Sequence, residues 1–182
     1  MASLTAAGVL VLAAAIAPRP DPPALRLESW RLRSRTVFVG TVTGVQRLGA
    51  LDGLTGDTQG RMEATVKIDK ALRVPAGVAA PAEAVVKFDS RTPEPEGDGF
   101  YALAVGERVL VFADGFEAAY PREMWHGAPA DLAAAVKTLR DFVNTMDAAT
   151  MPLHSLTPAT RTSQVRLYDE ALALLTKAGS VR

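Results

Sequence analysis

The fold of this chain is decided by one stretch of sequence, Thr36-Val-Phe-Val-Gly-Thr-Val-Thr-Gly-Val-Gln-Arg-Leu48. Most of its residues are β-branched or apolar, and such residues favour the pleated surface of a strand. Gly40 and Gly44 interrupt the run, and a glycine inside a strand marks a bulge or a tight bend. The first strand of a small barrel needs such a bend, because both halves of the barrel share it. We therefore predict a long, bent first strand.

Further strand patterns follow this first strand. In the second strand, apolar and polar residues alternate, which predicts that the apolar positions face a core. These positions are Met62, Ala64, Val66 and Ile68. The third and fourth strands are predicted at residues 84–89 and 107–113, and the unbroken apolar middle of the fourth indicates a central place in the sheet. With a short fifth strand at residues 117–120, the pattern indicates a small OB-type Greek-key β-barrel over residues 35–127.

After the strands, the hydrophobic period changes from two to about 3.6, which predicts two helices in residues 128–182. The first has Pro129 near its start, and the second opens with Thr157 as N-cap, followed by Pro158. The apolar stripe of the first consists of Leu132, Val136, Leu139, Val143 and Met146, and that of the second of Val165, Tyr168, Leu172 and Leu175. Isolated helices of this length are marginal in water, so we expect both to pack on the barrel. The predicted fold class is mainly β with α, a barrel followed by a helical hairpin.

The N-terminus has the features of a secretion signal. Residues 1–17 are uncharged, and Leu4 to Ala17 form an apolar stretch that is shorter than the roughly twenty residues of a membrane-spanning helix. We expect cleavage near residue 17, a Pro/Arg-rich lead-in segment over residues 18–34, and no stable membrane span afterwards. The predicted location is extracytoplasmic, either periplasmic or secreted. The alternative is a buried N-terminal helix.

The composition excludes several classes of function. The chain has 182 residues and no cysteine, so disulfides, thiolate nucleophiles and cysteine-based metal sites are absent. Twenty basic and twenty acidic side chains give a formal net charge of zero, so the chain as a whole has no electrostatic attraction for nucleic acid. We therefore do not expect nucleic acid as a partner.

Candidate catalytic and metal-binding residues do not form a known pattern. Asp52 and Glu63 have the spacing of the outer ligands of an EF-hand, but Leu54 and Gly56 stand where oxygen ligands are required. The two histidines, His126 and His154, are too far apart in sequence for a metal motif, and three carboxylates in residues 94–98 lie in a Pro/Gly-rich loop. We predict no catalytic residue, no metal and no cofactor. A hydrolase around either histidine is the third and weakest hypothesis.

One cluster could bind a partner. It consists of Arg26, Trp30, Arg31 and Arg33. Arginine and an aromatic ring together suit anionic or unstacked ligands. The alternative interpretation is a solvated face with Trp30 and Leu32 buried beneath it.

Three strand segments form a recognisable set: Val37-Phe-Val-Gly-Thr-Val42, Ala64-Thr-Val-Lys-Ile-Asp-Lys-Ala-Leu72 and Val105-Gly-Glu-Arg-Val-Leu-Val-Phe-Ala113. Together they resemble the bacterial secreted branch of the netrin-module/tissue-inhibitor-of-metalloproteinase superfamily. The resemblance covers residues 35–115 and implies a signal peptide, an OB barrel and protein binding. Inhibition in that superfamily relies on an N-terminal cysteine that binds the catalytic zinc of the protease. This chain has no cysteine, so no inhibitory residue is carried over.

Taken together, these features predict an exported, non-enzymatic protein that acts by contact with another extracytoplasmic protein. The alternative is an OB-type module that binds an extracellular oligosaccharide or another anionic polymer through the Arg/Trp30 segment.

Overall fold

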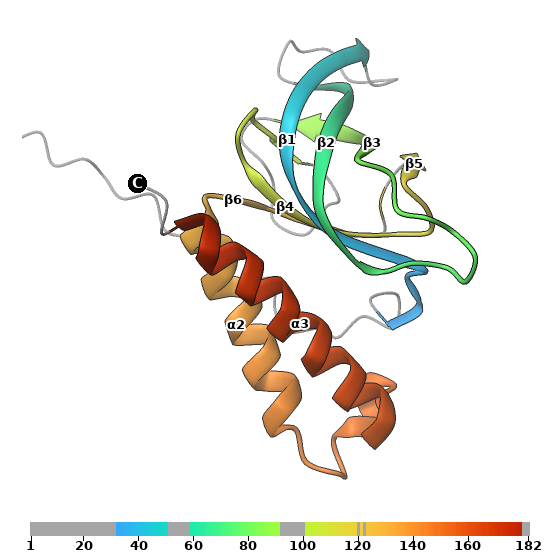
Figure 1. Cartoon of the computed structure of the whole chain (residues 1–182), viewed down its shortest axis with the longest axis vertical. Coiled ribbons are helices and arrows are strands. Elements are labelled where there is room, and N and C mark those ends of the chain that lie inside the picture. Colours follow the sequence, from blue (N-terminus) through green and yellow to red (C-terminus); the bar gives the residue numbers. More distant parts are fainter. Residues whose placement is uncertain (1–31, 51–58, 92–100, 120, 122, 180–182) are drawn as a thin grey trace, which may run out of the picture.

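A computed structural model of the 182-residue chain describes residues 32–50, 59–91, 101–119, 121 and 123–179 (Figure 1). The elements in chain order are β1 (Thr36–Gly49), β2 (Gln59–Arg73), β3 (Glu83–Arg91), β4 (Arg108–Ala113), β5 (Glu117–Ala119), β6 (Glu123–Gly127), α2 (Pro129–Thr145), the 3-10 helix η1 (Met151–His154) and α3 (Pro158–Gly179). The expected signal sequence lies outside the described residues. None of the helices in the described part is long and apolar enough to cross a membrane.

The strands form one sheet in the order β5-β3-β2-β1-β4-β6. Five of them pair antiparallel, and β5 joins β3 in parallel. The two outermost strands, β5 and β6, follow one another along the chain, so the two edges of the sheet come close together at this point. This arrangement confirms the predicted class, mainly β with a small barrel and a helical hairpin. Strand β6 was not predicted. Strand β4 is an interior strand between β1 and β6, but it is next to the edge of the sheet and not central as predicted.

Tyr101 joins the two edges of the sheet. Its backbone N–H donates a hydrogen bond of 3.0 Å to the carbonyl of Asp89, the seventh residue of β3. Its phenol oxygen accepts a hydrogen bond of 3.3 Å from the backbone N–H of Met124 in β6. The ring lies edge-on to Phe88 and His126, with centroid distances of 6.2 and 6.3 Å. One side chain therefore bridges the part of the barrel that strand pairing leaves open.

The predicted bend of the first strand is present in β1. Its register with β2 shifts between Val39 and Gly40 and again between Val42 and Gly44. A Cβ atom on Gly40 would lie only 2.5 Å from the carbonyl oxygen of Lys67 and from a methyl group of Val66. Glycine is required here because the two strand backbones approach too closely for any side chain.

Two apolar clusters stabilise the structure. The first fills the barrel and includes Phe38, Val66 and Val111, while the second lies between the outer face of the barrel and the two helices. Strand β4 is buried along its whole length because successive residues point into different clusters. Ala64 and Val66 are fully buried in the barrel, and Met62 and Ile68 are half-buried against it, which confirms the predicted inward face of β2.

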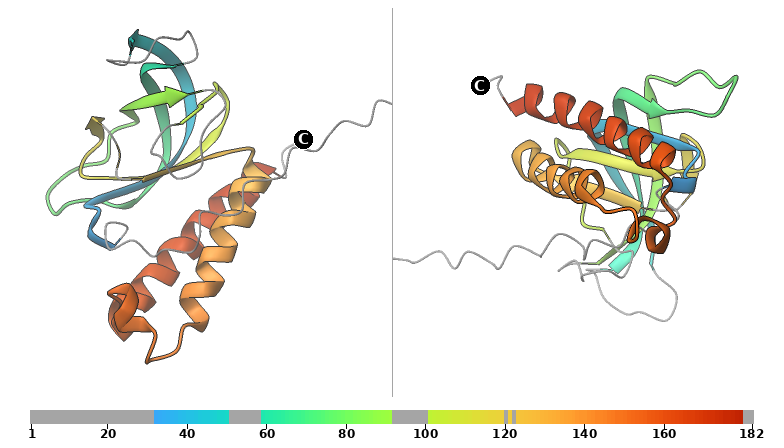
Figure 2. Two further views of the ribbon diagram at one scale, coloured as in Figure 1. Left: turned by 180° about the vertical axis from the view of Figure 1, so that it is seen from behind. Right: turned by 90° about the horizontal axis from the view of Figure 1, so that it is seen from below.

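The helical hairpin packs on one side of the barrel and extends beyond it (Figures 1 and 2). Helices α2 and α3 begin at Pro129 and Pro158, as predicted. Thr157 caps α3, because its hydroxyl accepts a bond of 3.2 Å from the N–H of Thr160, whose hydroxyl accepts one of 2.8 Å from the N–H of Thr157. The predicted stripe of α2 is buried throughout.

The predicted stripe of α3 needs a correction. Tyr168 and Leu175 are buried, but Val165 and Leu172 are only half-buried. The other buried positions of this helix are Gln164, Leu167 and Ala171. The buried face therefore differs from the predicted stripe, and it includes a polar side chain, Gln164, which is 1% exposed.

Candidate partner-binding site

The structure describes one of the four residues predicted to bind a partner. Arg33 is exposed, between half-buried Leu32 and Ser34, which is 1% exposed. Arg26, Trp30 and Arg31 lie outside the described residues. The next arginine, Arg35, is exposed as well. The folded body therefore begins with a short segment that alternates between buried and exposed positions.

Arg73, the last residue of β2, holds this segment in place. Its Nη1 donates hydrogen bonds to the carbonyl of Ser34 at 2.9 Å and to the carbonyl of Leu32 at 3.3 Å. Its Nη2 donates to Oε1 of Gln164 in α3 at 3.2 Å. Burial lowers the pKa of Arg73, and the negative form of the Tyr168 phenol acts in the opposite direction. One guanidinium thus connects the lead-in segment, the sheet and the last helix.

The polar connection continues into the core. The Nε2 of Gln164 donates a hydrogen bond of 2.7 Å to the phenol oxygen of Tyr168, one helical turn further along α3. Both side chains are almost completely buried. A buried amide without partners would be costly, so the contacts with Arg73 and Tyr168 fix the orientation of Gln164.

A shallow groove of about 310 Å³ lies beside Arg73, between β2 and α3. Its lining residues are Leu72, Arg73, Ser163, Arg166, Leu167 and Glu170. Leu72 and Leu167 provide the apolar part, and the remaining side chains are polar or charged. The groove therefore offers both charge and a small apolar surface to a ligand.

Glu170 is the carboxylate in the groove. Its Oε2 lies 2.9 Å from Nζ of Lys70, and its Oε1 lies 3.3 Å from Nε of Arg166. The hydrogen bond from Lys70, together with a smaller effect of Arg166, lowers the pKa of Glu170 below its ordinary value. Glu170 is therefore ionised at neutral pH and partly offsets the two cations beside it.

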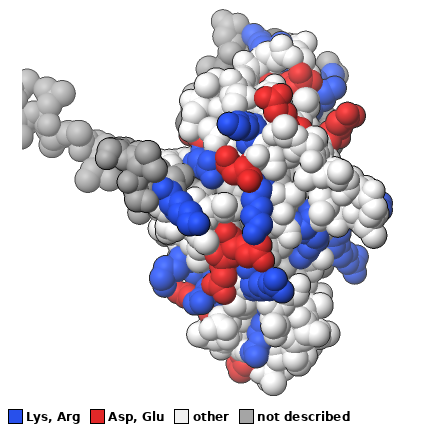
Figure 3. All heavy atoms as spheres, viewed as in Figure 1, with Lys and Arg blue, Asp and Glu red and all other residues white. Residues whose placement is uncertain are grey.

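The charges around the groove are uneven. Lys70, Arg73 and Arg166 line or adjoin it, and Arg33 and Arg35 flank the serine that Arg73 holds. Glu170 is the one carboxylate among the residues that line it. In Figure 3 the surface beside the start of β1 is mainly blue, while red and blue alternate along α3. A chain with a net charge of zero thus carries a local excess of positive charge here.

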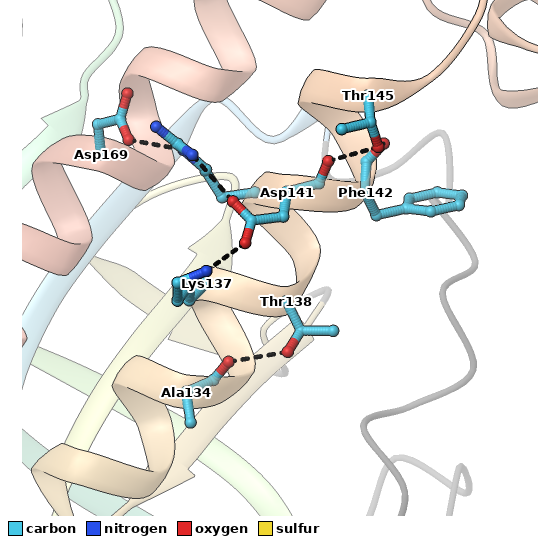
Figure 4. A network of polar contacts seen from close by, with 8 residues as sticks. Ala134, Lys137, Thr138, Asp141, Phe142, Thr145 and Asp169 are labelled. Carbon is cyan, nitrogen blue, oxygen red and sulfur yellow. Dashed lines mark hydrogen bonds and ion pairs between the residues drawn. The ribbon is translucent and has the colours of Figure 1, made fainter.

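The outer surface between α2 and α3 has balanced charges instead (Figure 4). Asp141 pairs with Lys137 and with Arg140, whose Nη1 lies 2.8 Å away, and the Nε of Arg140 lies 2.9 Å from Asp169 of α3. The hydrogen bond from Lys137, followed by that from Arg140, lowers the pKa of Asp141. Two cations and two carboxylates therefore neutralise each other on the surface between α2 and α3.

The other sequence candidates are not among the residues that line the groove, or they lie outside the described part. Nδ1 of His126 lies 3.2 Å from a carboxylate oxygen of Glu107, which also accepts the backbone N–H of Ala104 at 2.9 Å. His154 lies edge-on to Phe142, with a centroid distance of 5.6 Å. Glu63 is part of β2 and contacts Gln46 and Lys87. Asp52 and the carboxylates of residues 94–98 are outside the described residues.

Within the described part of the chain, no group of three or more potential metal-ligating side chains lies together.

Sequence reasoning missed Arg73, Gln164 and Glu170. Arg73 contacts Ser34 and Gln164, which are 39 and 91 positions away in the sequence, and no local sequence pattern predicts such contacts. Gln164 did give a signal, because it is a polar residue one turn before Tyr168 on a helix whose neighbouring stripe is apolar. Comparison with protein-family models, with curated proteins and with solved structures finds no match for this chain.

Proposed function

We propose that this chain is an exported, non-enzymatic protein that acts by contact with another extracytoplasmic protein. The observation that carries the proposal is the anchoring of Leu32 and Ser34 by Arg73. The chain just before this point contains Arg26, Trp30 and Arg31, so the predicted binding segment joins the folded body beside the groove. The resemblance to the netrin-module superfamily supports export and protein binding.

A contact surface that combines the lead-in segment with the groove agrees with the size that protein partners require. A stable interface buries about 800 Å² on each partner, which the groove alone cannot provide. The lead-in segment adds a tryptophan and several arginines, and both residue types are enriched where interfaces contribute most binding energy. We therefore assign the contact surface to the lead-in segment together with the groove between β2 and α3.

The contacts of the two histidines favour a structural role for them. His126 pairs with Glu107 and contacts the ring of Tyr101, which bridges the barrel edges. His154 packs on Phe142 in the hairpin. Each histidine thus contributes to local packing, which supports the non-enzymatic assignment.

The test has two parts. Mass spectrometry of the native protein from the cell envelope is expected to show a mature chain that lacks the first fifteen to seventeen residues; an intact N-terminus in the cytosol would refute export. Affinity capture with the mature chain is expected to retain a discrete envelope protein. The variant Arg26→Glu/Arg31→Glu/Arg33→Glu is expected to lose it. Equal capture by both chains would exclude the lead-in segment from the contact.

The alternative function, binding of an extracellular oligosaccharide or another anionic polymer, is favoured by the exposure of Arg33 and Arg35 on the lead-in segment. Such binding depends on counterion release and is weakened by salt. Retention on a heparin resin that is lost in Arg33→Gln/Arg35→Gln, without capture of any protein, would favour this alternative.

A further inference from the structure

The groove already binds one carboxylate, that of Glu170. Lys70 and Arg166 contact its two oxygens from opposite elements, β2 and α3. Arg166 is still largely solvent-accessible, with 82% of its side chain exposed. A second carboxylate can therefore approach the same cations from solvent.

The excess of positive charge at the groove favours a negatively charged ligand. The lining contains two cationic side chains, Arg73 and Arg166, and one carboxylate, Glu170, which also contacts Lys70. Partner surfaces that meet such a region are complementary in charge, because like charges opposite one another cost free energy. Leu72 and Leu167 also form an apolar floor, which a purely anionic polymer would not use.

We propose that this groove binds an acidic segment of the partner protein, with a carboxylate on Arg166 and Lys70 and an aliphatic side chain over Leu72. The proposal rests on the proposed function and names the partner chemistry of the same surface. Glu170 competes with the incoming carboxylate for the two cations. It weakens the interaction and offsets part of the positive charge of the groove when no partner is bound.

The test begins with a phage-displayed library of random nonapeptides, panned on the mature full chain. Enriched peptides are expected to contain Asp or Glu next to Leu, Ile or Val. Affinities of the synthetic peptides are then measured by fluorescence anisotropy at low and high salt. Binding is expected to weaken at high salt, because exposed charges are screened.

Four single variants make the test specific. Lys70→Gln and Arg166→Gln are each expected to weaken binding about two- to fivefold, the range of exposed ion pairs. Glu170→Gln is expected to strengthen binding by a similar factor. Lys87→Gln is the matched control, because Lys87 is 49% exposed and pairs with a glutamate, as does Lys70 at 48%. Its binding is expected to be unchanged.

The proposal is overturned if the panning enriches no acidic peptides, or if Glu170→Gln weakens binding. It is also overturned if Lys87→Gln has the same effect as Lys70→Gln, since the attraction would then be unspecific. Retention on heparin with the same variant pattern, without peptide enrichment, overturns it in favour of an anionic polymer. If the mature chain captures an envelope protein that all four variants retain equally, the groove proposal fails and the proposed function stands.

Discussion

Helix α3 is held differently along its two sides. On the side of α2 and the outer barrel face, Tyr168, Ala171 and Leu175 pack into an apolar cluster and are at most 1% exposed. On the side of β2, the contacts are polar, with Gln164 bound to Arg73 and Glu170 bound to Lys70. We call the contacts of α3 with α2 and the outer barrel face the apolar seam, and its contacts with β2 the polar seam.

The two sides of α3 are expected to contribute differently to stability and to binding. Apolar burial is nondirectional and strong, so the α2 side is expected to provide most of the free energy that holds the hairpin. The polar contacts replace hydrogen bonds with water, so their net contribution is expected to be smaller than that of the apolar burial, but they fix geometry. The charges between α2 and α3 are balanced, whereas those beside β2 leave an excess of positive charge, which fits the acidic partner segment proposed above.

The largest effect is expected from breaking the apolar seam with Leu139→Ala. Leu139 is 1% exposed in the cluster between the helices and the barrel. Removing its side chain leaves a cavity and should lower the free energy of unfolding by about 2–5 kcal/mol. The shift of the urea midpoint at constant slope measures this loss.

The control is Leu153→Ala in η1, whose side chain is 83% exposed. Its effect is expected to lie within about 0.5 kcal/mol. If both variants lost the same stability, the hairpin would not be packed on the barrel in solution.

A smaller effect is expected from Arg73→Met, which breaks the polar seam. The carbonyls of Leu32 and Ser34 and the amide oxygen of Gln164 each lose a donor, at a total cost of about 1–3 kcal/mol. The loss should be concentrated in the lead-in segment. Limited trypsin digestion with mass spectrometry is expected to show faster cleavage after Arg33. An unchanged rate there would contradict the anchoring role, and Lys87→Met serves as the surface control.

Tyr168→Phe tests the polar side of α3 more narrowly, because it removes the hydroxyl that accepts the bond from Gln164 and keeps the buried ring. Gln164 loses the acceptor of its Nε2, so the free energy of unfolding should fall by about 1 kcal/mol. In the double variant with Arg73→Met, the two effects should be non-additive by about 0.5 kcal/mol or more, since both residues bind Gln164. Simple additivity would mean that the two contacts are independent.

The sequence predicted the apolar seam well and the polar seam poorly. The buried stripe of α2 follows from its helical period, and the cap at Thr157 follows from a residue type with a known preference. These are local signals. Arg73 bonds to residues that precede it by about forty positions and to a residue in the last helix, and such contacts have no local period.

The error in the α3 stripe has the same origin. A stripe predicted from apolar residues alone includes Val165 and Leu172. It leaves out Gln164, because that side chain is polar. In the structure, Arg73 and Tyr168 provide hydrogen-bond partners for the Gln164 amide, so this polar side chain can lie on the buried face. The missed strand β6 is short and contains charged and aromatic residues, so no clean alternation revealed it.

The smallest effect is expected from Glu170→Gln, and its pH dependence tests the polar seam directly. Lys70, followed by Arg166, lowers the pKa of Glu170 in the folded state. A carboxyl with a lowered folded pKa stabilises the protein above its unfolded pKa of about 4.3, and this contribution is lost as the pH falls through the folded value. Because the side chain is 33% exposed, solvent screens the pair and the contribution should stay below about 1 kcal/mol. Urea unfolding between about pH 3 and pH 6 is therefore expected to show a small deficit of the variant near pH 6 that disappears in acid and at high salt. The same substitution is expected to strengthen the binding of acidic peptides, so its effects on stability and on binding have opposite signs. A variant that lost both stability and binding would show that Glu170 belongs to a structural pair, with no role in competing for the groove.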